Sequence, residues 1–167
     1  MAEPGLEELR KAREAAHRLL ARRARSVAEM KSKLAERRFS PAVIRLTVER
    51  LASVGYLDDA AFARSHARYL MEVRPMGRRR LSWELSRKGI EKGLVEEAVE
   101  EIWAGRSERE VAREVALRRL EAYRGLDETT VRRRLKGYLD RRGFPHGDIV
   151  EVVRELTSRK VPPASLK

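Results

Sequence analysis

The clustered arginines are the side chains of this sequence best suited to binding a partner. Two arginine triplets and three basic pairs recur along the chain. They are Arg78, Arg79 and Arg80; Arg132, Arg133 and Arg134; Arg37 and Arg38; Arg87 and Lys88; and Arg141 and Arg142. A guanidinium forms paired hydrogen bonds to phosphate or carboxylate groups and stacks on flat groups. The clusters therefore predict a partner that is a nucleic acid or an acidic protein surface.

Residues that could support catalysis or hold a cofactor are not grouped in the sequence. His17, His66 and His146 are far apart and have no second ligand at metal-binding spacing. The chain has no cysteine and no glycine-rich phosphate loop. Asp58 and Asp59 could form a metal pair, but a helix cap followed by a first-turn carboxylate is the better interpretation. We therefore expect a protein without enzymatic activity, metal or cofactor.

The overall charge also indicates an anionic partner. Among 167 residues, 38 are Lys or Arg and 26 are Asp or Glu, so the net charge is +12. A preference for arginine over lysine can follow genome composition or a hot habitat, but neither explains the net charge. The sequence has no apolar stretch of about 18 residues and no signal peptide pattern. We expect a soluble, cytoplasmic, monomeric protein that does not bind membranes.

A repeated ladder of apolar residues predicts the fold. It occurs three times, with a period of about 50 residues, which is typical of a tandem array of helical units. The copies are Leu34, Phe39, Ile44, Val48 and Leu51; Leu85, Ile90, Val95, Val99 and Ile102; and Leu139, Phe144, Ile149, Val153 and Leu156. Helical periodicity runs almost throughout, and strand signals are absent.

We therefore predict an all-α fold of nine helices, arranged as three tandem three-helix repeats in an elongated, curved array. The repeats are expected at residues 6–58, 59–106 and 107–158, followed by a loose tail at 159–167. N-cap chemistry predicts helix starts at Ser26, Ser40, Asp58 and Ser107. Gly89 and Gly143 are expected to close helices in the left-handed conformation. The first repeat has Arg38 at that place, and must adopt the same strained conformation or end its helix differently.

The basic clusters occupy recurring places in the repeat. Each middle helix is expected to end in a basic pair, and two middle helices begin or continue with an arginine triplet. Favourable interaction with helix C-termini explains the pairs, but it does not explain the triplets. Regular stacking of the repeats would align the clusters as a basic stripe able to follow a phosphate backbone.

The aromatic residues divide into one candidate for binding and several for the core. Trp83 points away from Leu81 and Leu85, the expected core positions of its helix. It could stack on a base, contact a partner protein, or fill a seam between repeats. The aromatic residues on apolar helical stripes, expected in the core, are Phe62, Tyr69, Trp103 and Tyr123.

Three short motifs in and beside the second repeat carry a family resemblance. They open the repeat, precede its middle helix and close that helix. Their residues are Gly55, Tyr56, Leu57, Asp58, Asp59, Phe62 and Ala63; Gly77; and Glu84, Leu85, Gly89 and Ile90. Together with Arg25, Ser26 and Glu29 in the first repeat, their order and spacing resemble the signature of the RecX family of bacterial recombination regulators. Met30 and Arg38 depart from the family's usual leucine and glycine.

The resemblance implies an all-helical inhibitor of the RecA recombinase. Members of this family bind in the groove of the RecA–DNA filament, suppress its ATPase and strand-exchange activity, and so regulate DNA repair, recombination and the SOS response. The resemblance also implies weak, salt-sensitive and non-specific DNA binding. The residues themselves leave open a second interpretation, a basic helical nucleic-acid-binding protein that acts independently of RecA. They also leave open whether the protein blocks filament ends or lies along the groove.

Overall fold

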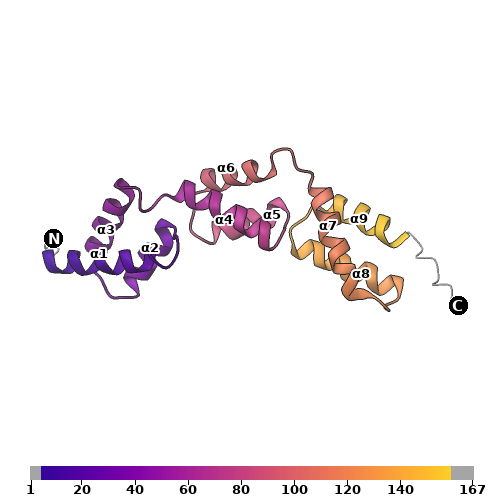
Figure 1. The fold of residues 1–167 in the computed structure, drawn as a ribbon, viewed down its shortest axis with the longest axis horizontal. Coiled ribbons are helices and arrows are strands. Elements are labelled where there is room, and N and C mark those ends of the chain that lie inside the picture. Colours follow the sequence, from indigo (N-terminus) through magenta and orange to yellow (C-terminus); the bar gives the residue numbers. More distant parts are fainter. Residues whose placement is uncertain (1–4, 159–167) are drawn as a thin grey trace. The chain divides into compact units, whose positions relative to one another are not determined.

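The computed structural model describes residues 5–158, and this part of the chain is helical without strands (Figure 1). Its helices follow in the order α1 (Leu6–Leu20), α2 (Val27–Ala35), α3 (Pro41–Ser53), α4 (Asp59–Val73), α5 (Arg78–Ser86), α6 (Lys92–Trp103), α7 (Glu108–Leu120), the 3-10 helix η1 (Glu121–Tyr123), α8 (Glu128–Arg141) and α9 (His146–Ser158). The all-α prediction is confirmed, and the tail at 159–167 lies outside the described residues. Among these helices, none has the length and apolar character needed to cross a membrane.

The helices begin at the N-cap residues expected from the sequence. The Oγ of Ser26 accepts a hydrogen bond from the amide of Glu29 at 3.1 Å, and Ser40 and Ser107 make the same contact for α3 and α7. The carboxylate of Asp58 accepts from a first-turn amide of α4 at 2.8 Å. Each such cap stabilises a helix by about 1 kcal/mol, because it satisfies an amide without a partner inside the helix.

The turns after α2, α5 and α8 each contain one residue in the left-handed region. The φ angle is 72° at Gly89 and 77° at Gly143, which confirms the expected helix closures. Arg38 has φ of 65°, so the first repeat uses the same turn with a residue that has a Cβ. That conformation costs about 1–2 kcal/mol for a residue other than glycine.

Internal contacts divide the chain into two compact units, and the division runs through the second repeat. One unit contains the chain up to Ala67 together with Glu84–Ala98. The other contains Arg68–Trp83 and the chain from Val99 onwards. Each unit therefore combines one complete repeat with part of the second.

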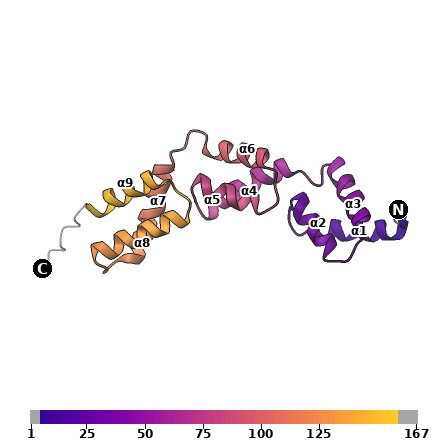
Figure 2. The ribbon, with the colours of Figure 1, turned by 180° about the vertical axis from the view of Figure 1, so that it is seen from behind.

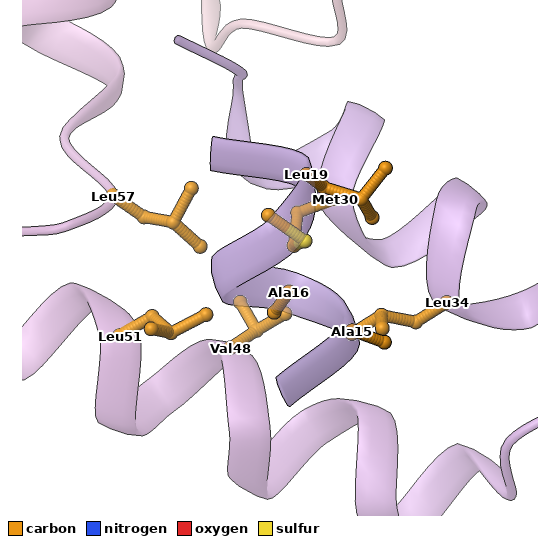
Figure 3. Packing of buried hydrophobic residues seen from close by; sticks show 8 residues of the cluster. All are labelled: Ala15, Ala16, Leu19, Met30, Leu34, Val48, Leu51 and Leu57. Atoms are coloured by element: carbon orange, nitrogen blue, oxygen red, sulfur yellow. The ribbon is translucent and has the colours of Figure 1, made fainter. Parts of the chain in front are cut away.

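In the first unit, α1, α2 and α3 pack around small and branched apolar side chains. Figure 3 shows the central cluster, which consists of Ala15, Ala16, Leu19, Met30, Leu34, Val48, Leu51 and Leu57. Met30 and Leu34, which lie four residues apart on α2, are completely buried. Phe39, a member of the repeated apolar ladder, is partly buried against this cluster. The departure from leucine at Met30 is thus accommodated inside the core.

In the second unit, α7, α8 and α9 pack against one another, and both ribbon views show α8 beside α9 (Figures 1 and 2). Leu135 and Leu139 of α8 and Val152 of α9 are completely buried. Hydrophobic burial of such residues, at about 25 cal/mol per Å² of apolar surface, is the main stabilising contribution.

The expected core position of one aromatic residue is wrong. Phe62, Trp103 and Tyr123 are buried, whereas Tyr69 is 57% exposed. Helix α4 buries the stripe that contains Phe62, Ala67 and Met71, and Tyr69 lies on another side of the same helix. Its apolar neighbours in the sequence suggested a wider buried stripe than the helix has.

Candidate partner-binding surface

The N-terminus of α2 is held by two segments of the second repeat, and we call this contact the first joint. The carboxylate of Asp59 accepts a hydrogen bond from the amide of Val27 at 2.8 Å. The Oγ of Ser26 donates to the carbonyl oxygen of Lys88 at 2.6 Å while it also caps α2. Ser26 is completely buried. The start of α4 and the turn after α5 therefore both contact the start of α2.

The N-terminus of α5 is held by the third repeat in the same way, at what we call the second joint. The carboxylate of Glu108 accepts from the amide of Arg78 at 2.8 Å. The amide of Gly77 donates to the carbonyl oxygen of Arg142 at 2.9 Å. In the aligned repeats, Gly77 takes the place of Ser26, and Arg142 takes the place of Lys88. The two joints are thus equivalent positions of successive repeats.

Glycine is required in both joints because atoms of the neighbouring repeat lie too close to leave room for a Cβ. A Cβ added at Gly89 would lie 2.3 Å from the Cβ of Ala28, and one at Gly143 would lie 2.5 Å from the amide nitrogen of Arg80. A Cβ at Gly77 would lie 2.3 Å from the carbonyl oxygen of Gly143. These distances are shorter than van der Waals contact, so no side chain fits without displacement of its neighbour. Three glycines of the repeat pattern therefore mark contacts between successive repeats.

The acidic acceptors of the joints make contacts between repeats that the local sequence does not predict. Asp59 is the first residue of α4, and Glu108 is the first residue of α7. The sequence places Asp59 in the first turn of its own helix and in the family signature, and it predicts no role for Glu108. One sequence feature could have indicated these contacts. Each carboxylate belongs to the first residue of the first helix of a repeat.

At the first joint, the side chain of Lys88 also contributes to the contact. Its Nζ lies 3.0 Å from the Oε1 of Glu29, which forms a second ion pair with Arg23 at 2.9 Å. Partial burial opposes ionisation of Glu29, but hydrogen bonds from Arg23 and Lys88 lower the pKa of its carboxyl to about 2. Lys88 therefore interacts with its own chain through both its carbonyl and its ammonium group.

At the second joint, Arg142 has an equivalent role. Its Nη1 donates to the carbonyl oxygen of Pro75 at 2.7 Å, and its Nη2 donates to the hydroxyl of Tyr138 at 2.8 Å. Burial lowers the pKa of Arg142 below its ordinary value. The structure therefore places the second residue of these two basic pairs, Lys88 and Arg142, inside the joints.

The first residue of each pair, Arg87 or Arg141, is exposed and lines a cavity beside its joint. The cavity at the first joint has a volume of about 380 Å³ and is also lined by Arg23 and Lys33. The cavity at the second joint has a volume of about 340 Å³ and is also lined by Arg79. Each joint thus places an exposed arginine of one repeat beside the middle helix of the preceding repeat.

The first arginine triplet is only partly available to a partner. Arg78 forms ion pairs with Glu100 and, at 3.9 Å, with Glu108. Arg79 donates to the carboxylate of Asp140 at 3.1 Å, although its side chain is 69% exposed. Exposed ion pairs of this kind contribute little to stability, so an anionic partner can exchange for Asp140 at low cost.

Trp83 lies beside the second joint and is exposed as well. Its side chain is 44% exposed, and the guanidinium of Arg80 lies 4.0 Å from its ring centroid. Both residues line the same cavity as Arg141. This placement fits a seam role and a partner-binding role alike, because the residue borders the seam between repeats and also offers surface to a partner.

The second triplet and the first pair are not among the residues that line the cavities at the joints. Arg132 and Arg133 line a third cavity, of about 380 Å³, between α8 and α9. Arg134 is exposed on α8, and Arg37 and Arg38 are exposed after α2. The structure therefore brings Arg79 and Arg80 of the first triplet together with Arg141 at one cavity.

The described residues contain no group of three or more His, Cys, Asp or Glu side chains arranged to hold a metal ion. Asp58 caps α4 and Asp59 accepts from Val27. The carboxylates considered as a metal pair thus have identified structural contacts. The chemistry that the surface offers is the binding of anionic groups by exposed guanidinium groups.

Comparisons with known proteins match the three-repeat organisation. Models of the first, second and third three-helix domains of RecX match residues 12–51, 58–99 and 107–153. The chain is 33% identical over 152 residues to regulatory protein RecX of Amycolatopsis mediterranei, covering 91% of this chain and 86% of that protein. It is 36% identical over 138 residues to regulatory protein RecX of Thermobifida fusca, covering 83% of this chain and 74% of that protein.

Solved structures share the fold. The crystal structure of RecX from Lactobacillus salivarius matches with a TM-score of 0.74 at 22% identity, covering 90% of this chain and 97% of that one. A crystal structure of regulatory protein RecX matches with a TM-score of 0.75 at 20% identity, covering 89% of this chain and 72% of that one. The matched domains and the sequence relatives together show that the chain belongs to the RecX family of regulatory proteins.

Proposed function

We propose that this chain inhibits a RecA recombinase by binding the RecA–DNA filament and suppressing its ATPase and strand-exchange activity. The observation that carries the proposal is the match of all three RecX domains in order, on a chain whose joints each present an exposed arginine. Exposed arginines suit a partner that has acidic protein surface and phosphates within reach. No chemical step is required, because binding alone can block filament growth.

The proposal is tested by titrating the chain against RecA from the same organism on single-stranded DNA. We expect ATP hydrolysis to fall and filaments seen by electron microscopy to shorten. Preferential loss at ends would favour end blocking, and coverage along the filament would favour groove binding. If saturating protein changes neither ATP hydrolysis nor filament length, the proposal is wrong.

A pair of matched variants tests whether the joint arginines contact the filament. The double variant Arg87→Ala with Arg141→Ala removes the exposed residue beside each joint. The control, Arg45→Ala with Arg124→Ala, removes two exposed arginines that pair within α3 and within η1 and its following turn. Both variants lose the same charge, so weaker inhibition by the first alone supports a specific role for the joint arginines.

A second candidate function is DNA binding independent of RecA. Trp83 favours it, because an exposed indole beside Arg79, Arg80 and Arg141 has the composition of a single-strand binding site. A gel-shift titration without RecA at rising salt tests this function. Tight binding at physiological salt would favour it, whereas weak binding that disappears with salt fits the RecA proposal.

A further inference from the structure

The groove between α8 and α9 is lined by cations and exposed apolar surface. Its charged lining residues are Arg132, Arg133, Lys136 and Arg154, and its apolar lining residues are Val150 and Val153. The side chain of Val150 is 40% exposed. A site of this composition is suited to a ligand that carries both carboxylates or phosphates and apolar groups.

The equivalent place in the second repeat is filled by the protein itself. When the apolar ladders of the second and third repeats are aligned, Arg78 corresponds to Arg132. The guanidinium of Arg78 pairs with the carboxylate of Glu100 and lies 5.7 Å from the ring centroid of Trp103. Trp103 is almost completely buried. A carboxylate and a large apolar side chain therefore occupy this place beside α5.

The third repeat lacks both of these groups. The same alignment puts Arg154 in the place of Glu100, and Thr157 in the place of Trp103. Arg132 donates to the hydroxyl of Thr157 at 2.8 Å, which corresponds to the contact of Arg78 with Trp103. A cavity of about 380 Å³ lies beside Arg132 here, and Arg154, in the place of the Glu100 carboxylate, lines it. Arg154 is thus a fourth cation at that cavity.

We propose that this groove binds an acidic amphipathic segment of a partner protein. Its carboxylates and apolar side chains take the places that Glu100 and Trp103 hold in the second repeat. Arg132 is paired with Glu128 at 2.7 Å, but both side chains are about half exposed, so the pair exchanges readily for an incoming carboxylate. The proposal goes beyond RecA inhibition, because it assigns a separate docking site and the chemistry of its ligand.

The charge and the lining residues of the groove disfavour the other occupants. The sequence after Ser158 contains Arg159, Lys160 and Lys167 but no Asp or Glu, so like charges oppose its binding to this groove. Nucleic acid would satisfy the cations through phosphate. However, the groove lining includes no aromatic side chain on which a base could stack, and phosphates leave Val150 and Val153 without apolar contacts.

The test uses the full chain and a short fluorescein-labelled peptide with the helical pattern Leu-Glu-Glu-Leu-Leu-Glu-Glu. A matched peptide has glutamine in place of each glutamate. Binding is measured by fluorescence anisotropy at physiological salt. We expect the glutamate peptide to bind at least about tenfold more tightly than the glutamine peptide, because only carboxylates pair with the four cations.

Two charge-reversal variants separate the groove from general attraction. Arg154→Glu restores the carboxylate that the second repeat has, and it should weaken binding of the glutamate peptide by about 10- to 100-fold. Arg106→Glu makes the same charge change at an exposed residue after α6 and should weaken it by less than about threefold. Val150→Ser should weaken binding by about three- to tenfold, because it removes apolar surface from the groove.

Equal losses in Arg154→Glu and Arg106→Glu would overturn the proposal, as would equal affinity for the two peptides. Displacement of the peptide by a DNA oligonucleotide, with DNA binding also lost in Arg154→Glu, would identify the groove as a nucleic-acid site instead. Suppression of RecA ATPase is measured on the same variants. The ATPase measurement tests the RecA proposal, and the peptide-binding measurement tests the docking groove, so failure of one is distinguished from failure of the other.

Discussion

Replacement of Gly143 by alanine should weaken the second joint. The alanine would need a left-handed φ of 77°, which costs about 1–2 kcal/mol. Its Cβ would also lie 2.5 Å from the amide nitrogen and 2.6 Å from the Cβ of Arg80, and relief of such overpacking costs about 1–3 kcal/mol. We expect a total loss of about 3 kcal/mol, which lowers the melting temperature of a protein of this size by about 6–12 °C.

The matched control is Gly125→Ala. Gly125 has φ of 84°, but a Cβ there would meet no atom within 4 Å. This variant should therefore lose only the backbone strain, about 1–2 kcal/mol, or about 2–8 °C. Melting of the three proteins is followed by far-ultraviolet circular dichroism. Equal losses in Gly143→Ala and Gly125→Ala would show that the close approach between α5 and the turn after α8 does not contribute to stability.

Three further predictions concern the joints and the exposed arginines. Asp59→Ala leaves the amide of Val27 without its acceptor and should lower the free energy of unfolding, measured with urea, by about 1 kcal/mol. Asp59→Asn keeps an oxygen acceptor and should lower it by less. Identical losses in the two variants would contradict the role of Asp59 as acceptor. Because the pKa of Glu29 is lowered to about 2, its ionised form stabilises the fold above the ordinary carboxyl pKa of 4.5, and this contribution is lost as pH falls towards 2. The difference in unfolding free energy between wild type and Glu29→Gln should therefore shrink over that range, and a pH-independent difference would refute the ion-pair explanation. Arg79→Ala combined with Arg141→Ala should weaken partner binding and change the melting temperature by less than about 3 °C, since both side chains are exposed; a larger drop would assign them a structural role.

The parts of the fold that depend on local chemistry were predictable from the sequence. The serine caps, the left-handed glycines and the apolar ladder each act within a few residues, so a single sequence contains their signals. The buried pairs Met30 with Leu34, and Leu135 with Leu139, follow directly from helical spacing. The exposed Tyr69 was predicted wrongly, because periodicity gives the direction of a buried stripe but not its width.

The joints could not be predicted in the same way, because they connect residues far apart in sequence. Asp59 contacts Val27 across 32 residues, and Ser26 contacts Lys88 across 62. Nothing in a local motif distinguishes the carboxylate of Asp59 from an ordinary first-turn acid. The sequence likewise predicts that Lys88 and Arg142 bind a partner, because each belongs to a basic pair at the end of a helix. A basic pair gives no indication that one of its members forms hydrogen bonds with its own chain. The contacts of individual arginines with a partner are predictions that the arginine variants described above test.

The second joint has a consequence for folding during synthesis. Helix α5 begins at Arg78 after Gly77, and the amide of Arg78 receives its acceptor from Glu108, 30 residues later. The acceptor for the amide of Gly77, the carbonyl of Arg142, is made later still. By contrast, α8 is capped by Asp127 immediately before it. A ribosome that has finished the second repeat has therefore not yet made the groups that complete the start of its middle helix, whereas α8 in the third repeat carries its own cap.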